Sequence, residues 1–269
     1  MDLLLNGGGQ AFTTPAAVVV GLMIGSFLNV VVWRVPRGES IVSPPSACPR
    51  CEHPIRARDN IPLISWLALR GRCRDCSEPI SPRYPLVEAL TGAFFGSAAW
   101  FAGLSWTLPA MLYLVAIGVA LALIDLDVHR LPDAIVLPSY LVGLLLLGLA
   151  AWNPGGAADW WALIRALIGG AAMLAVYLVL VLIYPTGMGL GDVKLAGVLG
   201  LYLGFFGWGS LLSGFFAPFL LGGLFAIGLL VAGRVGRKSG IPFGPWMVLG
   251  AFVGIFAGRQ IGEWYLSLL

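Results

Sequence analysis

The chain has 269 residues, of which 59% are hydrophobic and only 11% are charged, and its formal net charge is +3 at pH 7. An average soluble domain is about a quarter charged, so thirteen acidic and sixteen basic residues cannot cover a soluble globule of this size. The mean hydropathy of +0.91 agrees. This composition excludes a secreted mini-protein, a disordered chain and a soluble enzyme, and it predicts an all-α polytopic membrane protein.

Apolar segments long enough to cross a bilayer follow one another along the chain. A spanning helix needs about 20 residues, and we expect about eight such helices, at 12–33, 86–104, 108–126, 134–152, 161–184, 192–208, 211–233 and 244–266. The first segment lacks a basic start and an evident cleavage site, so we expect a retained helix, not a signal peptide. Small residues allow membrane helices to approach closely, and Gly21, Gly25, Gly169 and Gly170 are predicted to lie at such contacts.

One polar stretch interrupts this pattern. Residues 37–84 hold all four cysteines, and nine of the sixteen Lys and Arg residues lie between Arg34 and Arg83. The longest apolar run in this stretch, residues 61–69, is too short to span a bilayer. We therefore expect three parts: a first transmembrane helix at 1–36, a loop domain outside the lipid at 37–84, and a membrane-embedded domain at 85–269.

The basic residues also predict an orientation, because cytoplasmic loops carry an excess of Lys and Arg. The arginine-rich loop then lies in the cytoplasm and the N-terminus lies outside. With eight spans, the other cytoplasmic connections are 127–133, 185–191 and 234–243; the first holds Arg130, the last holds Arg234, Arg237 and Lys238, and Lys194 closely follows the second. The external connections 105–107, 153–160 and 209–210 contain no Lys or Arg. The sequence therefore predicts a multi-pass membrane protein with this orientation.

The four cysteines form two Cys-x-x-Cys pairs, Cys48 with Cys51 and Cys73 with Cys76, separated by 21 residues. Two such pairs can supply a tetrahedral four-thiolate site of the zinc-ribbon kind. The alternative is a pair of disulfides, which needs an oxidising compartment, whereas the cytoplasm keeps thiols reduced. We therefore predict a structural Zn²⁺ site; His53 follows closely as a further candidate, although four cysteines suffice.

Two aspartates stand at the same predicted membrane face, Asp125 at the end of the third span and Asp192 at the start of the sixth. Ionisable residues in spanning helices are functional candidates, and two carboxylates that share a proton can act as the acid and base of an aspartyl peptidase. Other interpretations remain open. Asp192 also suits the first turn of a helix, and Asp125 also suits an interfacial acid paired with Arg130 or Lys194.

Four motifs together resemble the type IV prepilin peptidases, the bacterial members of the GxGD membrane aspartyl proteases. They are GSFLNVVVWRVP at 25–36, YPLVEALTG at 84–92, Asp125 with LPD at 131–133, and GLGDVK at 189–194. The resemblance runs from about residue 15 to residue 250, in the family's order, and it implies a protein of the bacterial cytoplasmic (inner) membrane. It implies that Asp125 and Asp192 are catalytic, that Asp127 is peripheral, and that Gly189, Gly191 and Lys194 support the site.

The resemblance also implies a second activity. Longer members of the family methylate the new N-terminus of the cleaved pilin with S-adenosylmethionine, and the cysteine-bearing loop distinguishes them from shorter relatives. Glu88 is our candidate for the methyl-transfer region, although this acid can equally pair with an arginine of the loop. A further segment, Pro242 to Pro245, starts the last span and shapes its entry. The family has a similar Pro-Phe-Gly-Pro there, so the resemblance also allows this segment a lining role near the active site.

The resemblance predicts a membrane aspartyl endopeptidase and N-methyltransferase that acts on type IV prepilins or pseudopilins at the cytoplasmic membrane face. Its partners are these substrates and the lipid bilayer, and no nucleic-acid partner is expected. Two alternatives belong to other classes: a small proton- or cation-coupled transporter, and a non-catalytic zinc-bearing membrane scaffold. Leader removal that depends on Asp125 separates the peptidase from both.

Overall fold

The computed structural model describes residues 2–185, 187–233 and 241–268. The basic residues Arg234, Arg237 and Lys238, which contribute to the predicted orientation, lie outside the described residues. Within the described ranges the regular structure is helical, as the composition predicts, with two isolated β-bridges in the polar stretch.

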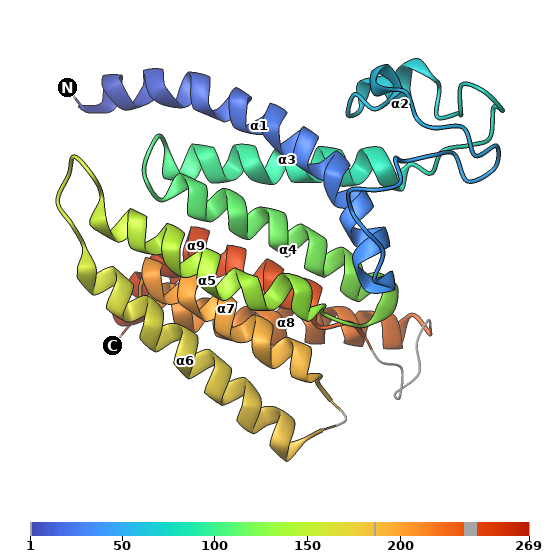
Figure 1. Ribbon diagram of the computed structural model, residues 1–269. Helices are drawn as coiled ribbons and strands as arrows, with labels where there is room; N and C mark the ends of the chain where they lie inside the picture. Colours follow the sequence, from blue (N-terminus) through green and yellow to red (C-terminus); the bar gives the residue numbers. More distant parts are fainter. Residues whose placement is uncertain (1, 186, 234–240, 269) are drawn as a thin grey trace. The chain divides into compact units, whose positions relative to one another are not determined.

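Figure 1 shows the helices in chain order, in colours from blue to red, with the polar stretch between α1 and α3. Their bounds are α1 (Asp2–Arg34), η1 (Val35–Arg37), η2 (Ala57–Asp59), α2 (Ile64–Ala68), α3 (Arg83–Ala102), α4 (Leu108–Val128), α5 (Asp133–Trp152), α6 (Trp160–Ile183), α7 (Leu190–Phe206), α8 (Trp208–Val231) and α9 (Gly244–Leu266).

Five helical segments of the described chain are long and apolar enough to cross a membrane: residues 10–37, α4, α5, α6 and α8. A helix lies at each of the eight predicted segments, but the predicted count of eight spans is not confirmed. One reason is length, since α7 has only 17 residues, fewer than the roughly 20 that a bilayer requires.

The chain divides into two compact units, Met1–Ala120 and Leu121–Leu269, and the division falls within α4. In the first unit α1 packs along α3. A side chain at Gly21 would come within 2.8 Å of the Cα of Gly92, and one at Gly25 within 2.7 Å of the Cα of Glu88. The predicted glycine contact of the first helix is therefore confirmed, and its partner is α3.

In the second unit α6 packs along α7, and α8 packs along α9. The α6–α7 contact is a glycine seam: a side chain at Gly169 would meet the carbonyl oxygen of Gly200 at 2.6 Å, and one at Gly170 would meet the carbonyl oxygen of Gly197 at 3.2 Å. Backbone-to-backbone packing of this kind is how membrane helices gain van der Waals contact. The seam fixes where the first turn of α7, which carries Asp192, lies against α6.

Candidate active site

Asp125 lies in the last turn of α4, and only 5% of its surface is exposed. Its Oδ2 accepts a hydrogen bond of 2.9 Å from the backbone amide of Gly244, at the start of α9. Just after the helix, His129 takes a positive φ of 51°, which turns the chain toward α5. A backbone donor from a distant helix thus fixes one oxygen of a buried carboxylate.

Asp192 lies in the first turn of α7, and its Oδ2 accepts a hydrogen bond of 2.9 Å from the backbone amide of Gly189. This bond satisfies an amide that the helix start would otherwise leave without a partner. The interpretation of Asp192 as a first-turn acid is therefore met. It uses one carboxylate oxygen, so it does not exclude a second role for the other.

The structure brings the two aspartates into one unit. Leu131 contacts the surroundings of both: a side chain at Gly244, whose amide binds Asp125, would lie 3.3 Å from Leu131, and one at Gly191, next to Asp192, would lie 3.0 Å from it. In each carboxylate Oδ2 accepts a hydrogen bond from a backbone amide. The remaining Oδ1 atoms are the oxygens with which the pair can share a proton and bind a water. Two neighbouring carboxylates in a low-dielectric site cannot easily both be ionised, and that is the condition for paired acid–base chemistry.

Contacts between α5 and α7 frame this pair. The Nζ of Lys194 binds both carboxylate oxygens of Asp133 at 2.8 Å, and the Tyr140 hydroxyl donates to the carbonyl oxygen of Lys194 at 2.6 Å. A side chain at Gly191 would come within 3.0 Å of the Cβ of Leu131. Lys194 therefore pairs with Asp133, and not with Asp125 as one of the sequence alternatives proposed.

Sequence reasoning predicted one residue near the pair in part and missed another. Gly244 lies in the Pro-Phe-Gly-Pro segment, for which the sequence predicted the entry of the helix and allowed a lining role near the active site; in the structure its amide binds Asp125. Tyr177 on α6 is fully buried, and its hydroxyl lies within the electrostatic influence of Asp192. No sequence signal distinguishes this tyrosine from the other aromatic residues of the spans.

The four cysteines also converge. Their sulfur atoms all lie within 4.8 Å of one another, with 3.7 Å between Cys48 and Cys76 and 4.0 Å between Cys51 and Cys73. Sulfurs at the corners of a tetrahedral site with metal–sulfur distances of about 2.3 Å lie about 3.8 Å apart. This donor set fits a four-coordinate metal ion, and the predicted cluster of four thiols is confirmed.

The two Cys-x-x-Cys turns have the same backbone design. In each, the amide of the first cysteine binds a carbonyl beyond the second cysteine (Cys48 to His53, 3.1 Å; Cys73 to Glu78, 2.8 Å), and a residue with φ of 61° follows the second cysteine. The backbone amides of Cys51 and Arg50 lower the pKa of the Cys48 thiol to about 7, from an ordinary 9.0. The backbone amides of these turns favour the thiolate, the form that binds metal, whereas burial and the neighbouring cysteines raise the pKa of the Cys51 and Cys76 thiols.

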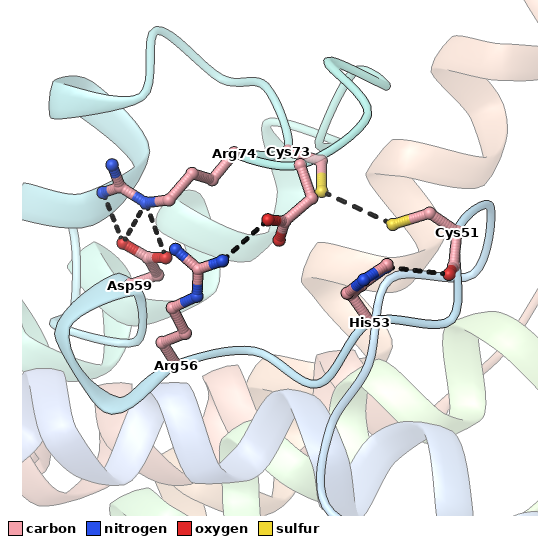
Figure 2. Close-up of polar contacts among 7 residues, drawn as sticks. Cys51, His53, Arg56, Asp59, Cys73 and Arg74 are labelled. Carbon is pink, nitrogen blue, oxygen red and sulfur yellow. Dashed lines mark hydrogen bonds and ion pairs between the residues drawn. The ribbon is translucent and has the colours of Figure 1, made fainter.

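Ion pairs brace the loop around this cluster, as Figure 2 shows. Arg74, next to Cys73, binds both carboxylate oxygens of Asp59, and this lowers the pKa of Asp59. Arg56 binds Asp75 at 2.8 Å. The Nδ1 of His53 lies 3.2 Å from the carbonyl oxygen of Cys51, outside the four-sulfur cluster.

Glu88 belongs to the first unit and is 8% exposed. Its Oε2 accepts a hydrogen bond of 2.8 Å from the amide of Leu63, the residue before α2. Leu63 has a φ of 60°, a conformation that is costly for a bulky side chain. The Glu88 carboxylate therefore holds a strained turn of the loop domain against α3, and its partner is a backbone amide where the sequence suggested an arginine.

Fold and sites together define a multi-pass helical membrane protein that has two aspartates bound to backbone amides and a cluster of four thiols that could bind a metal ion. Residues 112–227 match the type IV leader peptidase family, and residues 19–102 match the bacterial peptidase A24 N-terminal domain. No solved structure matches this chain.

Curated relatives cover nearly the whole chain. A prepilin leader peptidase/N-methyltransferase of Aeromonas salmonicida is 38% identical over 92% of this chain and 92% of its own. The chain is also similar to two proteins of the same name. The one from Neisseria gonorrhoeae is 36% identical over 95% of this chain and 96% of its own, and the one from Pseudomonas aeruginosa is 37% identical over 93% of this chain and 92% of its own. The chain belongs to the type IV leader peptidase family, so it is an enzyme, and the transporter and scaffold alternatives are not supported.

Proposed function

We propose that this enzyme is a membrane aspartyl endopeptidase in which Asp125 and Asp192 are the catalytic pair. The observation that carries the proposal is the matched setting of the two carboxylates. Each has one oxygen bound by a backbone amide at 2.9 Å, and Leu131 contacts the surroundings of both carboxylates. Such a setting leaves one oxygen of each carboxylate for the reaction.

The chemistry follows from a proton shared between the pair. The ionised carboxylate takes a proton from a bound water, whose oxygen attacks the scissile carbonyl carbon, while the protonated carboxylate donates its proton to the carbonyl oxygen. The tetrahedral intermediate then collapses, the C–N bond breaks, and the leaving amine takes a proton from the site. Gly189 and Gly191, without side chains, leave room for an extended substrate backbone. The ion pair between Lys194 and Asp133 joins the start of α7 to the start of α5.

The substrates are type IV prepilins or pseudopilins, from which the enzyme removes the basic leader. The names of the relatives support this class. The position of the pair also supports it, because Asp125 lies in the last turn of the candidate spanning helix α4 and Asp192 lies in the first turn of the apolar helix α7. A substrate whose short charged leader lies in water and whose following segment is apolar brings the junction between them to this depth.

The experiment is leader removal from a purified prepilin by the detergent-solubilised full-length enzyme. We expect Asp125→Asn and Asp192→Asn to lose more than about a hundredfold in cleavage rate, because each removes an acid or base. Asp127→Asn, two residues from Asp125, is the matched control and is expected to retain activity. Robust cleavage by either of the first two variants contradicts the proposed pair.

The enzyme also N-methylates the new N-terminus of its product. The relatives' names support this activity, and S-adenosylmethionine supplies the methyl group as an activated sulfonium. Glu88 is the proposed residue: one of its oxygens binds the Leu63 amide, and a buried carboxylate can accept a further donor, such as an ammonium group. Glu88→Gln retains an oxygen acceptor for the Leu63 amide, so it separates the two roles. We expect methyl transfer from labelled cofactor to fall while cleavage persists; unchanged methyl transfer rules out a cofactor role for Glu88.

The metal of the four-thiol cluster is Zn²⁺, and its role is structural, because four protein sulfurs fill a tetrahedral site and leave no open position. The loop domain lies in the cytoplasm and the N-terminus lies outside. The arginine excess of the loop supports this orientation. A reporter enzyme that is active only outside the cytoplasm tests it: we expect activity when it is fused after Gly103 and none when it is fused after Arg130.

A further inference from the structure

Tyr177 has a buried hydroxyl without a hydrogen-bond partner among the described residues. None of the side chain is exposed, and its Oη makes no hydrogen bond to any described part of the chain. Burying a hydroxyl without a partner costs free energy, and such groups in native proteins call for an explanation, which can be catalytic. A phenylalanine would fill the same space without this cost, so the hydroxyl needs a reason beyond packing.

The helix register places Tyr177 beside the start of α7. The glycine seam pairs Gly169 with Gly200, and a side chain at Gly197 would lie 3.0 Å from Leu174. Moving one turn further along α6 reaches Tyr177, and the antiparallel partner at that level is the first turn of α7, which holds Asp192. The charge of Asp192 acts on the Tyr177 hydroxyl.

The ring of Tyr177 also reaches the segment that holds Asp125. Its centroid lies 6.5 Å from that of Phe243, the residue directly before Gly244, and Gly244 donates its amide to Asp125. The ring centroids of Phe215 and Phe219 each lie 5.8 Å from the ring centroid of Tyr177. This apolar shell strengthens any hydrogen bond that the phenol makes, because the local dielectric is low.

We propose that Tyr177 is a positioning residue of the peptidase site, whose hydroxyl donates a hydrogen bond to the Asp192 carboxylate, directly or through one water, once substrate is bound. With Gly189 donating to Oδ2, a second donor fixes the orientation of this carboxylate for the reaction. The inference rests on the proposed function, because it assigns Tyr177 to the same reaction as Asp192.

The test is Tyr177→Phe in the full-length enzyme, measured by prepilin cleavage and by thermal unfolding. Loss of a hydrogen bond to a charged group predicts a fall in kcat of about 10- to 100-fold. We expect KM to stay unchanged. We expect the melting temperature to stay unchanged or to rise, because the free protein loses only a hydroxyl that has no partner among the described residues. Tyr140→Phe is the matched control for stability: its hydroxyl donates to the Lys194 carbonyl, so this variant is expected to melt lower.

Two results overturn the proposal. One is a Tyr177→Phe enzyme with the kcat of the wild type, and the other is a lower melting temperature, which would give the hydroxyl a structural partner. The wild type and Asp192→Asn are measured in the same assay. If the wild type cleaves and Asp192→Asn is inactive, the proposed function holds even where the Tyr177 inference fails. If the wild type does not cleave or Asp192→Asn does, the proposed function fails and this inference fails with it.

Discussion

The thiol cluster and the carboxylate pair are both small polar sites in an apolar chain, but they are assembled differently. Each half of the thiol cluster is a single turn, in which two cysteines three residues apart are shaped by bonds to neighbouring amides. The carboxylate pair depends on helices that are distant in sequence, and Asp125 binds an amide 119 positions away. The first site is specified by local spacing, whereas the second is specified by how helices pack.

The energy that holds each region also differs. In the polar stretch 37–84 the four thiols converge, and the ion pairs of Figure 2 brace the turns that carry them. In the second unit the glycine seam between α6 and α7 supplies close backbone contact, and single backbone amides orient the reactive groups. We therefore predict that removing a metal from the thiol cluster unfolds residues 37–84, whereas disturbing one backbone contact of an aspartate lowers the rate of cleavage.

Metal removal is expected to have the largest effect. Zinc binding to small four-ligand domains is worth about 10–16 kcal/mol of apparent free energy, so Cys73→Ser should release the metal and unfold the loop domain. Metal content by mass spectrometry and limited proteolysis of the loop measure this. His53→Ala is the control and should keep the metal, since His53 lies outside the sulfur cluster. A loop that resists protease equally with and without metal would show that the metal is not structural.

Gly244→Ala tests the opposite case, a contact that matters to the reaction. The added Cβ would lie 2.8 Å from Oδ2 of Asp125 and 3.3 Å from Leu131, so the carboxylate must move. Misplacement of a reacting group by about 1 Å can cost about a hundredfold in rate, and we expect a fall in prepilin cleavage of this order. Gly148→Ala is the control, because its Cβ meets nothing within 4 Å. Equal activity of the two variants would remove Gly244 from the site.

The Lys194–Asp133 pair is expected to have the smallest effect. Both side chains are substantially exposed, at 39% and 55%, and exposed pairs contribute less than about 1 kcal/mol. A double-mutant cycle of Lys194→Met and Asp133→Asn, followed by thermal unfolding, measures their coupling. A coupling several times larger would mean that this pair, and not backbone packing, holds α5 to α7.

The same contrast explains what the sequence could predict. The cysteine cluster, the helical class and the candidate aspartates depend on spacing or on the rarity of charge, and a single sequence displays both. The α6–α7 contact was partly foreseeable, since adjacent glycines in a span indicate close packing. The number of spans was not, because a helix such as α7 is too short for length and hydropathy to decide.

The partners of the predicted residues were out of reach for a different reason. Asp125 binds Gly244, Glu88 binds Leu63, and Lys194 binds Asp133. Two of these partners are backbone amides, which every residue except proline carries, so residue type gives no signal for them. Tyr177 is similar, because its significance depends on the missing partner of its hydroxyl, and that is a property of the packed structure.

The most direct test of the central claim, that Asp125 and Asp192 act as one catalytic unit, is the cleavage rate of Asp125→Asn, Asp192→Asn and the double variant under single-turnover conditions. Residues that act as a unit are strongly non-additive, so we predict that all three rates fall to the same residual level. Losses that multiply in the double variant, or a single variant with a rate near that of the wild type, would contradict the account.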